Sequence, residues 1–206
     1  MTTAGPPAVL AQGVALLERA MGYTLGSLQL VTSESLGNAT PCSEWDLRAL
    51  LLHMNESLQA LHEAIAVGHL ELDPSLDVTD VYADYGDPMR DPVASLRNRA
   101  CHMVGAWMSP SAPDVVSIAD RCVTADVVAV AGAIEVTVHG WDIAVACGVD
   151  HPIPEALARH LLDLCDVFVD DTDRPRRFGP EHVVRADATA AVRLLALLGR
   201  DPVGTG

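Results

Sequence analysis

Two side chains of metal-binding type lie one helical turn apart in this chain. Glu135 and His139 are four residues apart, so on a helix they point the same way and could hold one metal ion. Far upstream, His53 falls on the third turn of another predicted helix and could supply a third protein ligand. Two imidazoles and one carboxylate would leave one coordination position free for chemistry.

The angular positions of these residues around the predicted helices also favour a shared site. Each residue advances by about 100° around an ideal helix, which places Glu135, His139 and Asp142 on one flank of an apolar stripe. His53 lies about a quarter turn from the apolar stripe of its own helix by the same rule. Spacing alone leaves two interpretations open, because a Glu and a His one turn apart are often only a surface contact.

The elements that must position these residues are helices. Apolar residues recurring every three or four positions predict helices over 7–31, 44–67, 92–108, 125–147, 155–169 and 188–198. The predicted starts are Ser43 with Asp46 in a capping box, Thr124 and Asp187, and the predicted stops include Gly148 and Gly199. We expect an all-α protein, an up-down four-helix bundle over residues 1–150 with a short helical extension over 151–206 packed on it.

Two connecting segments carry charge. Residues 70–92 are acidic and contain three prolines, which predicts a long loop that could serve as a lid or only as a solvated connection. Arg174, Arg176 and Arg177 belong to a charged linker over residues 170–177 and could bind an anionic substrate if this linker folds over the bundle, although a solvated charge run is the commoner outcome.

Composition excludes several classes of function. The formal net charge of −15 argues against a nucleic-acid or anionic-membrane surface. All 13 cationic side chains are Arg, so lysine Schiff-base chemistry and a P-loop are excluded. We expect a small-molecule substrate, no nucleic-acid or membrane partner, and a monomer or homodimer.

The cysteines indicate a reducing compartment. The five Cys residues are widely spaced and form no CxxC pair, which is typical of reduced, mostly buried thiols. Cys42 precedes a helix start, where the helix dipole could lower its pKa, but a structural role is commoner. With neither a signal peptide nor an uninterrupted apolar run of membrane length, we expect a soluble, cytoplasmic protein.

Four segments resemble a known family. They are residues 40–53 (TPCSEWDLRALLLH), residues 135–144 (EVTVHGWDIA), Phe178-Gly179-Pro180, and residues 194–202 (LLALLGRDP). Together they resemble the DinB-like helical bundles, and among them the mycothiol-dependent maleylpyruvate isomerase N-terminal domain type, particularly a short actinobacterial metal-binding subgroup.

The resemblance implies a metal triad of His53, Glu135 and His139, the three residues that helix geometry also favours. Asp142 has no ligand role in the family pattern, so we interpret it as a partner that orients His139 or an Arg. Trp45 and Trp141 are interpreted mainly as packing residues, with positions in the wall of the site as the alternative. Maleylpyruvate isomerase itself carries a larger C-terminal domain than residues 150–206 provide, which counts against that particular reaction.

Two imidazoles and a carboxylate suit Zn²⁺, and Ni²⁺, Mn²⁺ or Fe²⁺ would also fit. The open position could hold mycothiol or another low-molecular-weight thiol as its thiolate, which predicts a transferase or isomerase acting on a small electrophile. A metal-bound water would instead give a hydrolase or lyase. A third alternative is a protein that binds the metal or a small ligand without turnover.

Overall fold

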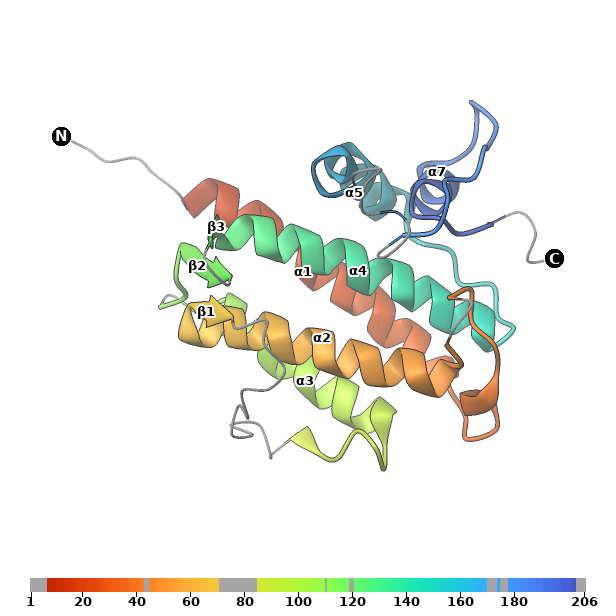
Figure 1. The fold of residues 1–206 in the computed structure, drawn as a ribbon, viewed down its shortest axis with the longest axis horizontal. Helices are drawn as coiled ribbons and strands as arrows, with labels where there is room; N and C mark the ends of the chain where they lie inside the picture. Colours follow the sequence, from red (N-terminus) through yellow and green to blue (C-terminus); the bar gives the residue numbers. More distant parts are fainter. Residues whose placement is uncertain are drawn as a thin grey trace.

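The computed structural model describes residues 7–42, 45–70, 85–109, 111–118, 121–169, 174 and 178–202, and this part of the chain is mostly helical (Figure 1). The helices are α1 (Pro7–Ser27), α2 (Leu47–Val67), α3 (Pro92–Trp107), α4 (Ala125–Ala146), α5 (Glu155–Phe168) and α7 (Ala190–Leu197). Two 3₁₀ turns, η1 (Leu28–Leu30) and η2 (Ser35–Gly37), follow α1. The strands are β1 (His69–Leu70), β2 (Val115–Ile118) and β3 (Arg121–Thr124).

The predicted starts of α1, α3, α4 and α5 are confirmed, and those of α2 and α7 differ by two or three residues. Asp46 itself caps α2, since its carboxylate accepts from the backbone N–H of Ala49 at 2.8 Å. Ser43, the predicted cap, lies outside the described residues. Thr189, not Asp187, caps α7 through the backbone N–H of Val192. Both predictions failed for one reason: neighbouring polar residues can each cap, and only the tertiary fold selects between them.

The predicted helix ends at glycine are confirmed. Gly148 after α4 and Gly199 after α7 adopt left-handed backbone angles, with φ of 67° and 76°. A left-handed residue lets the chain turn away while its N–H groups still bond the last helical carbonyls, and glycine adopts this conformation without steric cost.

Helices α1 and α4 run side by side in the same direction. Near their starts, the backbone N–H of Gly13 donates to Asp126 Oδ1 at 2.7 Å. Further along, Thr24 Oγ1 donates to the carbonyl of Val136 at 2.7 Å. Contacts that advance together along both helices require a parallel pair.

Helices α2 and α3 form a second parallel pair, and the predicted up-down order is therefore wrong. Asn55 Nδ2 donates to the carbonyl of Pro92 at 3.0 Å, and Arg99 Nη1 donates to Gln59 Oε1 at 3.2 Å. Because α2 runs opposite to α4, the order is up, down, down, up. The long segment between α2 and α3 permits this return, whereas a short loop would have forced neighbouring helices to be antiparallel. Most of the acidic loop predicted over 70–92, which could serve as a lid, cannot be compared with the structure, because residues 71–84 lie outside the described residues.

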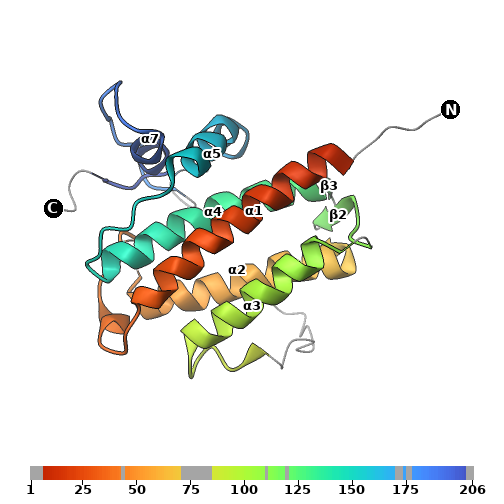
Figure 2. The ribbon, with the colours of Figure 1, turned by 180° about the vertical axis from the view of Figure 1, so that it is seen from behind.

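The four long helices form two layers. Helices α2 and α4 lie toward the viewer in Figure 1, and α1 and α3 come to the front in the reverse view of Figure 2. Helix α5 packs on α1, α4 and α7 at one side of this assembly. The division into a bundle and an extension stays a prediction.

A small sheet corrects the all-α prediction. Its strand order is β1-β2-β3, with β1 parallel to β2 and β2 antiparallel to β3. The strands adjoin the ends of α2 and α3 and the start of α4, and Val116 is fully buried there. Val, Ile and Thr favour strands, but strands this short are weak signals in a sequence dominated by helical periodicity.

Helix α4 lies at the centre of the core. Among the described helices it is the one long and apolar enough to cross a membrane, and 83% of its most apolar window is buried within the protein. A core helix passes the same test of length and composition, since a helix that is apolar all round is one buried on all sides. The polar side chains of α4, among them Glu135, His139 and Asp142, are therefore unusual for a helix in this position.

Candidate metal centre

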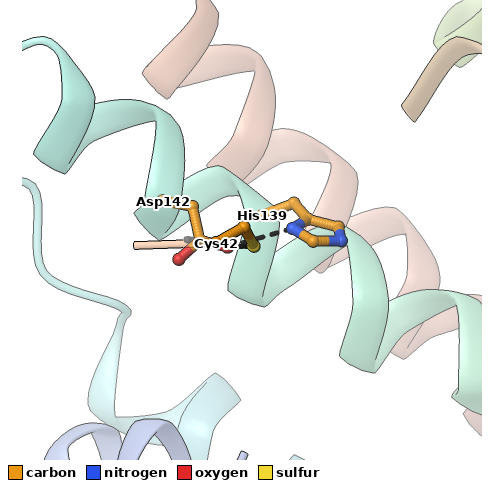
Figure 3. Close-up of side chains that lie close together, drawn as sticks. All are labelled: Cys42, His139 and Asp142. Atoms are coloured by element: carbon orange, nitrogen blue, oxygen red, sulfur yellow. Dashed lines mark hydrogen bonds and ion pairs between the residues drawn. The ribbon is translucent and has the colours of Figure 1, made fainter. Parts of the chain in front are cut away.

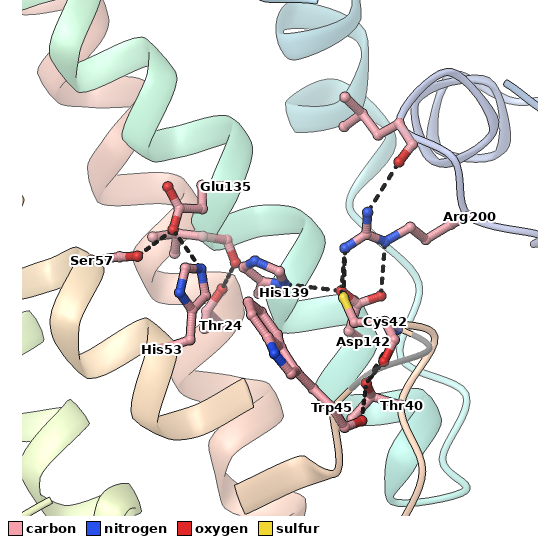
Figure 4. Close-up of polar contacts among 12 residues, drawn as sticks. Thr24, Thr40, Cys42, Trp45, His53, Ser57, Glu135, His139, Asp142 and Arg200 are labelled. Atoms are coloured by element: carbon pink, nitrogen blue, oxygen red, sulfur yellow. Dashed lines mark hydrogen bonds and ion pairs between the residues drawn. The ribbon is translucent and has the colours of Figure 1, made fainter. Parts of the chain in front are cut away.

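The structure brings His53, Glu135 and His139 together between α2 and α4 (Figure 4). One potential ligand atom from each lies within 4.8 Å of the other two. His53 Nε2 is 3.3 Å from Glu135 Oε1, and the two imidazole ring centroids are 5.4 Å apart. The three residues selected by helical spacing thus meet at one point, although the sequence separates His53 from the other two.

The antiparallel packing of α2 and α4 explains this convergence. Residues four apart lie on one face of a helix. His53 and Ser57 are such a pair on α2, and Glu135 and His139 are the facing pair on α4. Since the helices run in opposite directions, Ser57 contacts Glu135 while His53 lies between Glu135 and His139.

Glycine allows α4 to approach its neighbours closely on both sides of this site. A Cβ atom at Gly132 would lie 2.7 Å from Leu61 Cδ1 on α2. A Cβ atom at Gly140 would lie 2.5 Å from Thr24 Oγ1 on α1. The two glycines therefore set the depth at which α4 sits and hence the position of its polar flank.

Two donors hold the carboxylate of Glu135. Ser57 Oγ donates to Oε1, and His53 Nε2 approaches the same oxygen. Burial raises the pKa of Glu135. The hydrogen bonds from His53 and Ser57 and the neighbouring imidazoles lower it by more than burial raises it, so the pKa lies below its usual value. The side chains of His53 and Glu135 are 33% and 38% exposed, so solutes can reach them, whereas that of His139 is only 11% exposed.

Asp142 orients the imidazole of His139. The Oδ2 atom lies 3.0 Å from His139 Nδ1. Burial raises the pKa of Asp142, but the hydrogen bond from His139 and the charge of Arg200 outweigh it, so the pKa is lowered and the carboxylate is ionised. Because a carboxylate only accepts hydrogen bonds, Nδ1 carries the proton and Nε2 presents its lone pair. This arrangement, with a carboxylate behind a histidine, is typical of metal-bound imidazoles.

One comparison with known proteins identifies the family. The sequence model of the mycothiol maleylpyruvate isomerase N-terminal domain family matches residues 17–144. The chain belongs to this family. The matched residues of this mycothiol maleylpyruvate isomerase N-terminal domain include the three clustered side chains and Asp142. No curated protein and no solved structure matches the chain.

Trp45 lies closer to the cluster than its packing interpretation suggested. Its ring centroid is 4.5 Å from that of His53 and 6.3 Å from that of His139. Trp45 is half-buried and forms a wall beside both imidazoles, so the alternative interpretation of this residue fits the geometry better. Trp141 is 8% exposed and belongs to the core, as expected.

Cys42 lies beside Asp142, with its Sγ 3.4 Å from Oδ2 (Figure 3). Cys42, His139 and Asp142 form a second group with metal-binding atom types within 4.8 Å of one another. Burial and the charge of Asp142 raise the pKa of the thiol to about 12, despite the opposing charge of Arg200. The helix-dipole interpretation, which would lower this pKa, is therefore wrong, because α2 begins only at Leu47 and Asp142 is closer.

Sequence reasoning missed Ser57 and Arg200. Ser57 could have been found, because it lies four residues after His53 on the same helix face. Arg200 carried no such signal, since 58 residues separate it from Asp142. Of the arginines considered for substrate binding, Arg174 donates to the carbonyls of Gly179 and Leu197, and Arg176 and Arg177 lie outside the described residues.

Proposed function

We propose that this protein binds one divalent metal ion through His53, Glu135 and His139. The observation that carries the proposal is the convergence of two imidazoles and one carboxylate within 4.8 Å, in a member of a family related to mycothiol chemistry. This donor set suits Zn²⁺, and Ni²⁺, Mn²⁺ and Fe²⁺ are further candidates. The proposed scaffold is a DinB-like four-helix bundle, with α5 and α7 packed against it.

The chain's own residues prepare the site. Asp142 keeps the proton of His139 on Nδ1, which leaves Nε2 free to bind. Ser57 fixes one oxygen of Glu135, and Trp45 covers one side of both imidazoles. A bound divalent metal supplies a Lewis acid that favours the thiolate form of a small thiol at neutral pH. The exposure of His53 and Glu135 gives such a thiol a route to the site.

The reaction we propose is thiol-dependent transfer or isomerisation on a small electrophilic metabolite, with mycothiol or a similar thiol as cosubstrate. Addition of the thiol sulfur to an electrophilic carbon of a double bond leaves a single bond that can rotate. Loss of the thiol after this rotation restores the double bond and gives isomerisation, whereas retention of the thiol gives transfer. We propose that the protein acts in the cytoplasm as a monomer or homodimer, without nucleic-acid or membrane partners.

Metal analysis of purified protein tests the proposed site. We expect wild-type protein to hold one metal equivalent, and the His139→Ala and His53→Ala variants to lose most of it, because each lacks one ligand. His160→Ala is the matched control, since His160 is exposed on α5 and, within the described part of the chain, its ring contacts the carbonyl of Ala156 on its own helix. Unchanged metal content in both ligand variants would contradict the assignment.

Calorimetric titration with mycothiol tests the reaction class. Binding that occurs with the metal-loaded protein and not with the metal-free protein would support the proposal. Metal-dependent turnover of an ester, amide or similar substrate without thiol would favour a hydrolase or lyase using a metal-bound water. Tight ligand binding without turnover of any electrophile would favour a binding protein.

A further inference from the structure

We infer that Arg200, which follows α7, is a positioning residue that holds His139 in its metal-binding form through Asp142. This inference rests on the proposed metal site. It goes beyond that site because it assigns a role to a segment outside the family match of 17–144. Figure 4 shows Arg200 reaching from beside α7 to the carboxylate behind His139.

The contact between Arg200 and Asp142 uses two nitrogens and both carboxylate oxygens. Arg200 Nε lies 3.2 Å from Oδ1, and Nη2 lies 2.7 Å from Oδ2. The third nitrogen, Nη1, donates to the carbonyl of Leu198 at 3.0 Å. Side-chain exposure is 9% for Arg200 and 0% for Asp142, so the pair is removed from water. A bidentate ion pair in this environment fixes the orientation of the carboxylate plane and stabilises its negative charge.

That plane determines how His139 is held. The same Oδ2 atom that accepts from Arg200 also accepts from His139 Nδ1 and from the Cys42 thiol, as Figure 3 shows for the latter two residues. Because a guanidinium can only donate, Oδ2 remains an acceptor beside Arg200, and His139 Nδ1 must therefore be the donor in its own contact with Oδ2. Among the described residues, removal of Arg200 leaves His139 and Cys42 as the hydrogen-bond donors to this carboxylate. Neither of these two donors constrains Oδ1.

Arg200 also links the folding of the C-terminal segment to the site. Its Nη1 bond to Leu198 and its position one residue after the left-handed Gly199 tie the guanidinium to the end of α7. The end of α7 must therefore dock before Asp142 receives its partner. We infer that docking of this segment raises metal affinity without contributing a ligand.

The test combines metal affinity with the protonation form of His139. In metal-free wild-type protein, ¹⁵N–¹H correlation spectra should show His139 as the Nδ1–H tautomer. In Arg200→Met we expect a mixture of tautomers and a loss of about 10–100-fold in Zn²⁺ affinity, measured by competition with a chelator. Arg200→Lys keeps the charge without the two-pronged geometry and should fall between the two, which retains a test if Arg200→Met folds poorly.

Arg174→Met is the matched control. Arg174 supports the same C-terminal segment by donating to the carbonyls of Gly179 and Leu197 and by an ion pair with Glu181. We expect the Zn²⁺ affinity of this variant to stay within about twofold of wild type, because these bonds of Arg174 lie within the C-terminal segment and not at Asp142.

A double-mutant cycle with Asp142→Asn tests the route of the effect. If Arg200 acts through Asp142, Arg200→Met should weaken Zn²⁺ binding much less in the Asp142→Asn background than in wild type. Unchanged affinity and an unchanged Nδ1–H tautomer in Arg200→Met would overturn the inference. Wild-type protein that binds none of Zn²⁺, Ni²⁺, Mn²⁺ and Fe²⁺ would overturn the proposed function instead, while the tautomer of His139 in the metal-free variants would still decide the role of Arg200.

Discussion

The close packing of α1 on α4 at Gly140 gives a prediction that can be worked out from the structure. A Cβ atom added there would lie 2.5 Å from Thr24 Oγ1, 3.1 Å from Tyr23 Cε1 and 3.2 Å from Thr24 Cα. The last contact involves backbone, so a side-chain rotation cannot relieve it. Helix α1 must shift away from α4, and the buried hydrogen bond from Thr24 to the carbonyl of Val136 is weakened or lost.

These terms give an expected cost for Gly140→Ala. Overpacking costs about 1–3 kcal/mol, and a buried polar group left without its partner costs about 1–3 kcal/mol. The better helix propensity of Ala returns about 1 kcal/mol. We therefore expect a loss of about 3 kcal/mol in the free energy of unfolding, measured by urea denaturation followed by circular dichroism.

Gly22→Ala is the matched control, because Gly22 is exposed on α1 and a Cβ atom there would meet nothing within 4 Å. It should stabilise the protein by about 0.5–1 kcal/mol, the opposite sign. Thr24→Ala combined with Gly140→Ala should cost less than the sum of the single changes, since the smaller side chain makes room for the new methyl group. A Gly140→Ala variant as stable as wild type would refute the packing argument.

Three further predictions concern the site. Cys42 should react with iodoacetamide at pH 8 about 1,000-fold more slowly than exposed Cys101, because only the thiolate reacts and the pKa of Cys42 is raised from 9.0 to about 12. Comparable alkylation rates of the two cysteines, measured by peptide mass spectrometry, would contradict this prediction. The same raised pKa predicts that the contribution of Cys42 to stability is present below pH 9 and declines above it, because above pH 9 the Cys42 thiol ionises more readily in the unfolded chain than in the folded protein. A Cys42→Ser variant that loses stability at alkaline pH to the same extent as wild type would contradict this prediction. Ser57→Ala should weaken Zn²⁺ binding by about tenfold by releasing Glu135, and unchanged affinity in a chelator competition would show that Ser57 does not orient the carboxylate.

The sequence predicted part of the cluster from helical periodicity, because the spacing of residues within one helix is a local property. The pairing of Glu135 with His139 depends only on helical periodicity, which a buried apolar helix displays clearly. The contribution of His53 depends on α2 facing α4, which the family resemblance supplied and periodicity alone could not. The family assignment itself is confirmed.

Sequence patterns could not predict the features that depend on contacts between distant segments. The direction of α3 relative to α2 depends on how the connecting segment travels, and helical periodicity is the same in both directions. The sheet uses strands as short as His69–Leu70, which stabilise only by pairing with each other. The pairing of Arg200 with Asp142 depends on the docking of α7, a tertiary event without a local signature.

The buried pair of Arg200 and Asp142 is better explained by the site than by stability, and a pair of variants separates these explanations. Asp142→Asn alone leaves a buried guanidinium without its counter-charge and should cost about 3–5 kcal/mol in the free energy of unfolding. Replacing both residues, as Asp142→Leu with Arg200→Met, removes both desolvation penalties and should recover most of that loss. Metal affinity should not recover, because His139 Nδ1 still lacks its acceptor. If the double replacement restored affinity together with stability, the pair would be a packing feature, and the orientation of His139 would need another cause.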